Sequence, residues 1–215
     1  MEDIRKEMRD LRRDFDYGTL DVTDVPEDPI ELLKTWLADA VSLKIKDANA
    51  FVISTVVNGQ PDSRVVLIRD ILEDGFHFYT NYGSKKALDL EGNNKVAINI
   101  FWPEMDRQIR MYAIVEKLSN TLSDDYFKTR PRASQIGAWA SIQSTELDTR
   151  QTLEKRIEDL EKQFEGKEVT RPNFWGGYKV SPSYYEFWQG RPSRLHDRII
   201  YKSSDSNWII KRLYP

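Results

Sequence analysis

The sequence contains no cysteine and only two histidines among its 215 residues. The absence of cysteine excludes disulfide bonds, thiolate metal ligands and a cysteine nucleophile. Because two isolated histidines do not make a ligand cluster, no metal site is expected. The sequence also lacks an apolar run that would suit a signal peptide or a membrane span. We therefore expect a cytoplasmic protein without a membrane segment.

An excess of basic residues is also missing, since the formal net charge is −3. Such a chain has no general attraction to nucleic acid, so a phosphate ligand would have to be held by local clusters of cations. Hydrophobic residues make up 40% of the chain and aromatic residues 12%, as in globular proteins. The length suits one domain spanning residues 1–215, with residues 1–20 as a mobile N-terminal arm.

Three segments have the pattern of helices. Residues 3–14 are highly charged and are typical of a marginal helix or a mobile arm. Asp28-Pro29-Ile30-Glu31 supplies an N-cap, a proline at the first helical position and an acid in the first turn, which predicts a helix over 29–41. Apolar residues at helical spacing, from Leu153 to Phe164, predict one amphipathic helix.

Strands dominate the rest of the chain. Residues 50–57 and 63–71 flank the tight-turn pair Asn58-Gly59, which predicts an antiparallel hairpin. Sequential strands with few helices between them favour an antiparallel Greek-key barrel with peripheral helices, an α+β fold, over a parallel sheet. The glycine fingerprint of parallel dinucleotide-binding folds is missing. Further strands are expected at 75–80, 96–102, 108–118, 184–188, 198–202 and 208–213.

A first candidate anion site lies where a strand turns into a helix at Ser84-Lys85-Lys86. We expect Ser84 to cap this helix. Lysines in a first turn are unfavourable beside the positive end of the helix dipole unless an anion binds there. The alternative is that both lysines are simply solvated, at a cost of about 0.3 to 1 kcal/mol.

Two arginines bracket an apolar strand in Arg64-Val-Val-Leu-Ile-Arg69. Their odd separation places them on opposite faces of an ideal strand. They would then serve two different anions, unless a bulge brings them together. The sequence leaves both possibilities open.

Another pair of arginines surrounds Pro131 in the segment from Ser123 to Trp139. Ser123 is expected to cap a short helix that ends near Arg130, because the residue before a proline disfavours helical geometry. Ser134 is expected to cap the next helix and to expose backbone N–H groups beside the arginines. This segment is a second candidate phosphate site, with ordinary capping and surface arginines as the alternative.

The segment from Arg194 to Tyr201 contains one of the two histidines, His196. If it is a strand, Arg194, His196 and Arg198 project from one face and form an anion-binding surface that can handle protons. The alternative is the solvated face of an edge strand. The other histidine, His77, lies in a strand pattern and is expected to be structural.

Six segments together, in order along the chain, resemble the pyridoxamine 5'-phosphate oxidase family. The resemblance implies an FMN-binding split β-barrel and a homodimer with FMN at its interface. It also implies oxidation of pyridoxamine or pyridoxine 5'-phosphate to pyridoxal 5'-phosphate, with O2 as acceptor and H2O2 as product. The segments are residues 64–69, 78–87, 130–139, 174–177, 186–190 and 194–198.

The resemblance also implies roles for particular residues. Arg194 would orient the substrate ring as a catalytic residue, and His196 would contact the reacting group, while a hydride passes to N5 of the flavin. Substrate contacts are expected at Arg69, Tyr126, Arg130, Ser134, Arg194, Leu195 and His196. Cofactor contacts are expected at Arg64, Val65, Val66, Leu67, Ile68, Arg69, Tyr79, Thr80, Lys85, Lys86, Gln108, Gln143, Ser144, Trp188 and Arg198.

Some positions depart from the family pattern. Arg69 stands where a lysine is usual, and Lys85 stands at a position often held by arginine. Phe15 replaces a tyrosine in the N-terminal arm near Arg12, which puts a polar contact from the arm in doubt. Tyr112-Ala113 replaces a more usual acid and glycine. Two alternatives remain open: another split-barrel flavin oxidoreductase, or a non-catalytic carrier of pyridoxal phosphate or flavin.

Overall fold

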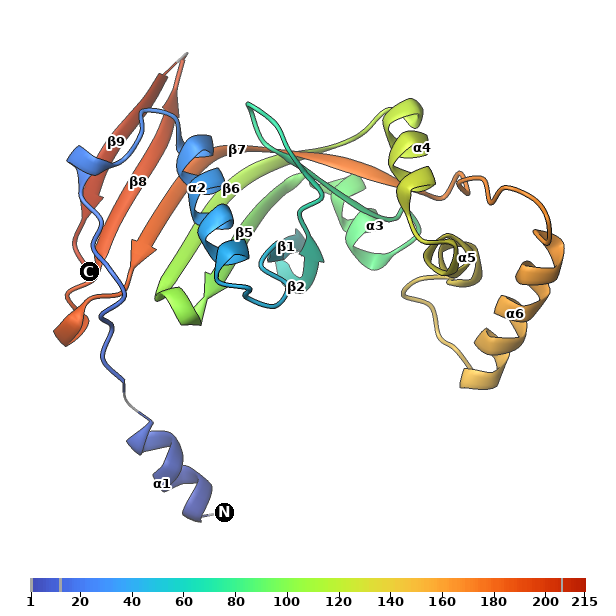
Figure 1. Ribbon diagram of the computed structural model, residues 1–215, viewed down its shortest axis with the longest axis horizontal. Helices are drawn as coiled ribbons and strands as arrows, with labels where there is room; N and C mark the ends of the chain where they lie inside the picture. The colour runs from blue at the N-terminus through green and yellow to red at the C-terminus, as the bar shows by residue number, and fades with distance from the viewer. Residues whose placement is uncertain (1, 12, 206) are drawn as a thin grey trace. The chain divides into compact units, whose positions relative to one another are not determined.

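The computed structural model describes residues 2–11, 13–205 and 207–215, so that Arg12 lies outside the described residues (Figure 1). Its strands are antiparallel wherever the residue register is defined, and its helices lie outside the sheet, which confirms the predicted α+β class. The helices are α1 (Glu2–Asp10), α2 (Pro29–Ser42), α3 (Lys85–Gly92), α4 (Asn120–Thr129), α5 (Arg132–Ala140) and α6 (Arg150–Gln163). The strands are β1 (Ala50–Val57), β2 (Gln60–Leu67), β3 (Asp70–Ile71), β4 (Phe76–Asn81), β5 (Lys95–Trp102), β6 (Arg107–Lys117), β7 (Trp175–Gln189), β8 (Asp197–Ser204) and β9 (Asn207–Leu213).

The hydrogen-bonded strands follow the order β2-β1-β5-β6-β7-β4-β3, and β8 and β9 extend from β7. The chain divides into two compact units. We call the first the terminal unit, because it holds the chain up to Ala48, Asn99–Met111 and Ser183–Pro215. The central unit comprises Asn49–Ile98 and Tyr112–Pro182. A single domain with a mobile arm at residues 1–20 stays a prediction.

The terminal unit contains α2 and a meander of the second half of β7 with β8 and β9, drawn in orange and red in Figure 1. Helix α2 begins as predicted: the Asp28 carboxylate accepts a hydrogen bond from the Ile30 N–H at 2.9 Å, and Pro29 is the first helical residue. The Trp36 ring of α2 packs edge-on against Phe187 of β7, with 5.2 Å between the centroids. The face of α2 that carries Trp36 is therefore buried against β7 and belongs to the core of the terminal unit.

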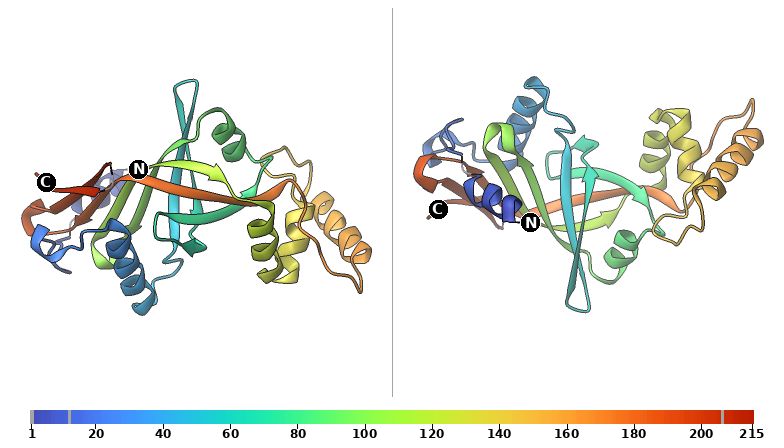
Figure 2. Two further views of the ribbon diagram at one scale, coloured as in Figure 1. Left: turned by 90° about the horizontal axis from the view of Figure 1, so that it is seen from above. Right: turned by 90° about the horizontal axis from the view of Figure 1, so that it is seen from below.

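The central unit begins with the predicted β1–β2 hairpin. Asn58 and Gly59 have φ angles of 50° and 78°, as the two central residues of a primed turn require. On the other side of the unit, helices α4, α5 and α6 lie side by side in both views of Figure 2. They enclose an apolar cluster that includes Phe127, Ile136 and Phe164. Strand β2 and helices α4 and α5 contribute to the walls of the cavity described below.

The predicted strand 63–71 is in fact two strands, because the chain changes partner after residue 68. The Ile68 N–H donates to Asn49 O, whereas the Arg69 N–H donates to His77 O, both at 2.9 Å. Strand β2 therefore ends at Leu67, and strict alternation does not extend to Arg69. His77 is buried in β4, in agreement with a structural role.

The predicted start of the strand at Tyr184 was wrong, because strand β7 begins nine residues earlier, at Trp175. The first half was missed because its glycines resemble turn residues. A Cβ atom at Gly177 would lie 2.6 Å from the Tyr79 ring, and one at Gly176 would lie 2.2 Å from the Tyr82 hydroxyl. Glycine is needed here because aromatic rings of the neighbouring segment lie directly against the strand.

Two predicted helix caps were also wrong. Helix α4 is capped by Ser119, whose hydroxyl accepts a hydrogen bond from the Leu122 N–H, and Ser123 lies inside the helix and binds the Gly177 N–H. Helix α5 begins at Arg132, directly after Pro131, so Ser134 lies within its first turn rather than before it. Pro131 itself is the N-cap residue, and it forms no side-chain cap hydrogen bond.

Strand β8 contains the predicted strand 198–202 but begins only at Asp197, so the condition that Arg194 belongs to a strand is not met. Residues Pro192–Arg194 form a 3₁₀ turn, in which Ser193 and Arg194 have positive φ angles of 57° and 61°. The alternation that placed Arg194, His196 and Arg198 on one face therefore does not apply. None of the described helices is long and apolar enough to span a membrane.

Replacing Leu33 by alanine tests the packing of α2. Leu33 is fully buried, so Leu33→Ala should lower the free energy of unfolding by about 2 to 5 kcal/mol. On the same helix Val41 is 64% exposed, so Val41→Ala should change the free energy of unfolding by no more than about 0.5 kcal/mol. Urea unfolding followed by circular dichroism measures both variants, and equal effects would contradict the described orientation of the helix.

Candidate active site

The central unit contains a cavity of about 580 Å³. Its walls come from the end of β2, from β4, from the start of α3, from α4 and α5, and from the loop after α5. Most of the residues predicted to bind cofactor or substrate in this unit meet here. They are Arg64, Val65, Val66, Leu67, Arg69, Tyr79, Thr80, Lys86, Tyr126, Arg130, Ser134 and Gln143.

The cations of this cavity form two pairs of like charge. Burial lowers the pKa of Lys86, and the nearby guanidinium of Arg64 lowers it further. Burial also lowers the pKa of Arg130, and the charge of Arg69 adds to that effect. Positive charges that repel one another inside a cavity are stabilised when an anion binds between them. Two such pairs favour two anion subsites, one of the possibilities that the sequence left open for Arg64 and Arg69.

The Arg130 guanidinium packs against aromatic rings at the cavity wall. It lies 4.4 Å above the Trp175 ring and 5.4 Å from the Phe127 ring. Its Nη1 atom is buried without a hydrogen-bond partner among the described residues. A buried donor without an acceptor is destabilising by about 1 to 3 kcal/mol, and by more when it is charged. A planar, bidentate guanidinium in this state suits a phosphate or carboxylate group.

Aromatic rings line one wall of the same cavity. Tyr79 stacks on Tyr126 with 3.8 Å between centroids, and Trp175 is stacked 5.6 Å from Tyr79. Burial raises the pKa of Tyr79 to about 12, so its hydroxyl stays neutral at physiological pH. A flat aromatic ligand whose anionic group reaches the cations would fit this wall.

The Lys86 ammonium group is held among hydroxyl groups. It donates to the hydroxyl oxygens of Thr80 at 3.1 Å and of Ser84 at 3.3 Å. The Thr80 hydroxyl in turn donates to the Gln143 side-chain carbonyl at 3.3 Å. Ser84 is the N-cap of α3 as predicted, although its hydroxyl caps no backbone N–H. The lysine, hydroxyl and helix N-terminus together can bind an anion through several donors.

Three predicted cofactor residues of this unit lie outside the cavity lining. Ile68 is a buried core residue. The Lys85 ammonium group binds the carboxylates of Asp62 and Asp89, at 3.0 Å and 3.2 Å. Ser144 is exposed, with a positive φ of 71°, in the loop next to Gln143.

Five cavity residues were not predicted to have a role. Asn81 could have been recognised from the sequence as a turn residue. Its carboxamide oxygen accepts a hydrogen bond from the N–H of Gly83 at 2.7 Å and so forms the turn before α3. Trp175 belongs to one of the segments that resemble the family, but its ring contact with Arg130 depends on the tertiary fold. The small residues carry no chemical signal. The five are Asn81, Gly137, Ala138, Ser141 and Trp175.

The terminal unit holds a second cluster, centred on His196. Its ring lies 4.6 Å from Trp188 and 5.2 Å from Phe15, measured between centroids. The Nδ1 atom accepts a hydrogen bond from the Arg191 N–H at 3.1 Å, so the neutral ring carries its proton on Nε2. Burial lowers the pKa of His196, and the adjacent Arg194 lowers it further. At neutral pH this imidazole therefore donates a hydrogen bond from Nε2.

The N-terminal arm contributes to this cluster. The Arg13 side chain forms an ion pair with the buried Asp106 carboxylate and donates to Pro103 O at 3.0 Å. A smaller cavity of about 350 Å³ lies here, lined by Arg13, Asp14, Phe15, Ser193 and Arg194. Phe15 thus contributes ring packing where the family pattern has a tyrosine.

The remaining predicted residues of the terminal unit differ in exposure and in side-chain hydrogen bonding. The Arg198 guanidinium donates to Glu186 at 3.0 Å and to Tyr214 O at 2.9 Å. Leu195 is 68% exposed, and Gln108 is half-buried on β6. No group of three histidine or acidic side chains that could hold a metal ion occurs in the described part of the chain.

The chain is similar in fold to an FMN-binding protein of Nostoc punctiforme related to pyridoxamine 5'-phosphate oxidase, at 17% identity with a TM-score of 0.69. That match covers 92% of this chain and 100% of the other chain. The likeness confirms the predicted split-barrel fold.

Family models identify the chain more specifically. The pyridoxamine 5'-phosphate oxidase model matches residues 37–164, and the pyridoxine 5'-phosphate oxidase C-terminal dimerisation region matches residues 175–215. The chain therefore belongs to the pyridoxamine 5'-phosphate oxidase family and is an oxidoreductase of that family.

Individual relatives agree with this assignment. The chain is 45% identical to the pyridoxine/pyridoxamine 5'-phosphate oxidase of Cupriavidus metallidurans, over 97% of this chain and 99% of that protein. It is 43% identical to the enzyme of the same name from Rubrobacter xylanophilus, over 100% and 99%. It is also similar to PhzG of Burkholderia lata, solved with tetrahydrophenazine-1-carboxylic acid, at 29% identity with a TM-score of 0.85. That last match covers 92% of this chain and 100% of the PhzG chain.

The pKa of His196 can be tested directly, because the chain has only one other histidine. Replacing the neighbouring cation in Arg194→Met should raise the pKa of His196, since it removes a repulsion that disfavours the imidazolium form. Proton NMR of the ring Cε1–H signals across pH measures this shift. His77 serves as the control, and its pKa should be the same in the variant and in the wild type. An unchanged or lower pKa of His196 would contradict the described contact with Arg194.

Proposed function

We propose that this protein is an FMN-dependent oxidase that converts pyridoxamine 5'-phosphate and pyridoxine 5'-phosphate to pyridoxal 5'-phosphate, with O2 as acceptor and H2O2 as product. The observation that carries the proposal is the buried Nη1 of Arg130, which has no hydrogen-bond partner among the residues that the structure describes, in a cavity that also holds a second pair of cations. A phosphorylated cofactor together with a phosphorylated substrate requires two anion subsites. Membership of the family supports the same reaction.

We assign the phosphate of FMN to the pair Arg64 and Lys86, together with Thr80. The donors at this end of the cavity are a guanidinium, an ammonium, hydroxyl groups and the N-terminus of α3. These groups fit a phosphate monoester, which accepts hydrogen bonds only. Further cofactor contacts are proposed at the residues 65–69, Tyr79, Lys85, Gln143 and Ser144.

The assembly is proposed to be a homodimer with FMN at its interface. The match of residues 175–215 to a dimerisation region supports this proposal. Gln108, Trp188 and Arg198 are the cofactor contacts proposed from the terminal unit. When bound, FMN would supply the redox chemistry by accepting a hydride from the substrate carbon that becomes the aldehyde, and it would pass the two electrons to O2.

The substrate phosphate is assigned to the second cation pair, Arg69 and Arg130. Tyr126 and Ser134 line the same part of the cavity and add hydroxyl donors. A guanidinium at residue 69 keeps the charge of the usual lysine but offers a planar, bidentate group. Phosphate binding there is therefore retained with a different geometry.

Arg194, Leu195 and His196 are the proposed contacts to the substrate ring. Arg194 is proposed to orient the ring, and its backbone is already fixed at a φ of 61° by the turn that precedes β8. His196 is proposed to donate a hydrogen bond from Nε2 to the reacting group, since its Nδ1 is occupied by the Arg191 N–H. A depressed pKa keeps the ring neutral, so its role is to donate a hydrogen bond rather than to carry a charge.

A second candidate is a related flavin oxidase that acts on a carboxylated ring. It is favoured by the likeness to PhzG, which was solved with a ring carboxylic acid. An unpaired guanidinium such as Arg130 binds carboxylate as well as phosphate. Comparison of phosphorylated with unphosphorylated substrates separates the two candidates.

The purified protein loaded with FMN should consume O2 and release H2O2 with either phosphorylated vitamer. The variants Arg194→Ala and His196→Ala should keep their bound FMN, seen by absorbance, and lose most of the O2 uptake, measured with an oxygen electrode. They lose turnover because the substrate ring is no longer held for hydride transfer.

The proposal fails if the FMN-loaded wild type is inert to both vitamers. Unchanged turnover in both variants would leave the reaction standing but overturn the assigned roles of Arg194 and His196.

Replacing Arg130 by methionine tests the substrate subsite. Hydrogen bonds to a charged group are worth about 1.5 to 3 kcal/mol, so Arg130→Met should lower kcat/KM for pyridoxine 5'-phosphate roughly 10- to 100-fold. Turnover of unphosphorylated pyridoxine should change little, because this substrate has no phosphate for Arg130 to bind. Steady-state O2 uptake with the two substrates measures the difference.

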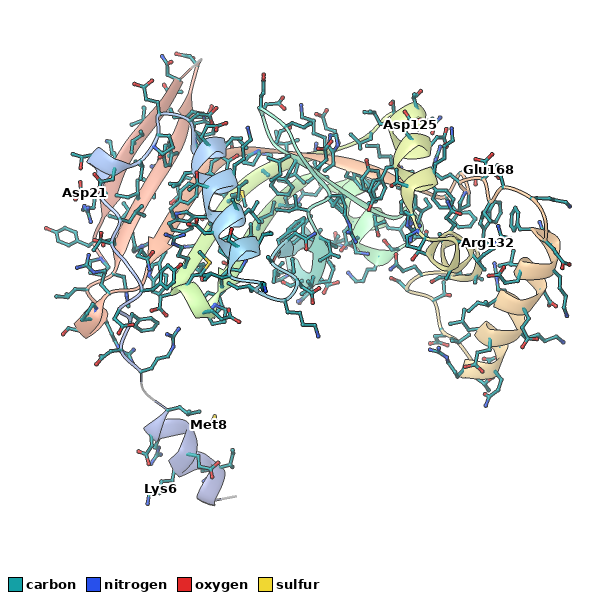
Figure 3. All side chains as sticks on the ribbon, in the orientation of Figure 1. Lys6, Met8, Asp21, Asp125, Arg132 and Glu168 are labelled. Carbon is teal, nitrogen blue, oxygen red and sulfur yellow. The ribbon has the colours of Figure 1, made fainter. Side chains whose placement is uncertain are left out.

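Arg132 provides a matched control two residues away. Its guanidinium projects from α5 and binds the backbone carbonyls of Phe164 and Lys167 (Figure 3). Arg132→Met should leave both rates near those of the wild type. An equal loss in the two variants, or an equal loss with both substrates, would contradict the phosphate role of Arg130.

A further inference from the structure

Two carboxylates meet the cations at the cofactor end of the cavity. Arg64 donates to Asp62 at 2.6 Å, and its guanidinium lies 3.5 Å from Asp89. The Lys85 ammonium group contacts the same two acids, at 3.0 Å and 3.2 Å. Two cations and two acids thus form a closed quartet that has no net charge. The family resemblance gave no role to either acid.

Asp89 is built into the protein interior. Its side chain is only 8% exposed, and its carboxylate accepts a hydrogen bond from the fully buried hydroxyl of Thr55 at 2.6 Å. It lies one turn after Lys85 on α3, the spacing at which helix side chains meet. Burial opposes its charge, but the hydrogen bonds from Thr55 and Lys85 outweigh that effect and keep the pKa of Asp89 low. Asp89 is therefore a fixed anion.

Thr55 also connects Asp89 to Arg64. The Arg64 Nη1 atom donates to the Thr55 hydroxyl at 2.8 Å and lies 3.4 Å from Ile53 O. Residue 55 is paired with residue 62 across the β1–β2 hairpin, and residue 64 lies on the same face as residue 62. The Arg64 guanidinium is thus held by β1 and by Asp89. This arrangement keeps the guanidinium at the cavity wall instead of in solvent.

Asp62 is held quite differently. Its side chain is 37% exposed on β2, and its carboxylate lies against the two cations and accepts from the Ser63 backbone N–H. The hydrogen bond from Lys85 and the charge of Arg64 lower its pKa, so it is an anion at neutral pH. An ion pair of this exposed kind contributes little to stability, because solvent screens it. Asp62 thus occupies the cations in the way that a phosphate oxygen would, but with little to keep it there.

We propose that these two acids act in opposite directions on cofactor binding. Asp89 is a positioning residue that holds Arg64 and Lys85 ready for the phosphate of FMN. Asp62 is a resident competitor that neutralises the same cations until the phosphate displaces it. This inference rests on the proposed function, because the anion in question is the cofactor phosphate.

The same contacts explain why Lys85 does not line the cavity, although it was expected to contact the cofactor. Its ammonium group is engaged by Asp62 and Asp89. Departure of Asp62 would free hydrogen-bond donors on both Lys85 and Arg64 at once. A phosphate dianion offers more acceptor oxygens than a carboxylate, so it can replace Asp62 at both cations.

Opposite changes in FMN affinity test this inference without measuring activity. Asp62→Asn removes the competing charge, so the Kd of FMN should fall roughly 2- to 5-fold, and the association rate should rise. Asp89→Asn removes the fixed anion, so the Kd should rise roughly 10-fold or more. Quenching of flavin fluorescence on mixing with apoprotein gives the affinity at equilibrium and the rate in stopped flow.

Two further variants serve as controls. Asp159→Asn makes the same change of charge on the exposed face of α6 and should leave the Kd unchanged. Thr55→Val keeps the shape but removes the hydroxyl that holds Asp89, and it should weaken FMN binding in the same direction as Asp89→Asn. If Asp89→Asn does not fold, judged by its unfolding transition, Thr55→Val and Asp62→Asn decide the question.

The inference is overturned if Asp62→Asn binds FMN no more tightly than wild type. It is equally overturned if Thr55→Val and Asp89→Asn bind FMN as tightly as wild type. Failure of the proposed function looks different, because the wild-type protein itself would then show no saturable quenching of FMN.

Discussion

Positive charge that the fold retains inside a cavity is the constraint from which the rest of the site follows. Arg69, Lys86 and Arg130 line this cavity, and none of them forms an ion pair within the part of the chain that the structure describes. Burial lowers the pKa values of Lys86 and Arg130, and repulsion from Arg64 lowers that of Lys86 further, as repulsion from Arg69 does for Arg130. A protein that keeps such an arrangement gains free energy when anions bind. The cavity is thus suited to anions before any ligand binds.

The fold keeps these charges in place with apolar and backbone interactions. Trp175 and Phe127 support the guanidinium of Arg130 from its ring-facing side, so that its N–H groups remain available. The Tyr79 ring fits against β7 only because residue 177 is glycine. The change of partner after Ile68 separates Arg69 from the strand that carries Arg64. Packing of aromatic rings and one switch between strands therefore set the spacing of the two subsites.

The sequence was informative wherever a local pattern determines the structure. The cap at Asp28, the Asn58-Gly59 turn and the lysines after Ser84 all lie where they were predicted, because each depends on a few neighbouring residues. Most of the cofactor and substrate residues predicted in the central unit also line one cavity, although their assignment came from family resemblance rather than from periodicity.

What the sequence did not reveal depends on contacts between distant segments. The glycines of β7 resemble a turn until Tyr79 and Tyr82 are placed against them. The turn at Ser193 and Arg194 cannot be recognised from residue type, since neither residue favours a positive φ. The acids Asp62 and Asp89 are unremarkable in sequence and gain significance only beside Arg64 and Lys85. The ion pairs between β2 and α3 join residues that are far apart in the sequence, so no single motif predicts them.

The central claim is that the cavity holds two phosphates in separate subsites, and phosphorus NMR tests it most directly. The FMN-loaded protein should show one bound phosphate signal. Titration with pyridoxal 5'-phosphate should add a second bound signal while the first keeps its full intensity, and Arg130→Met should weaken only the second. Loss of the FMN signal in proportion to the added pyridoxal 5'-phosphate would mean that the ligands share one subsite, and it would contradict the account.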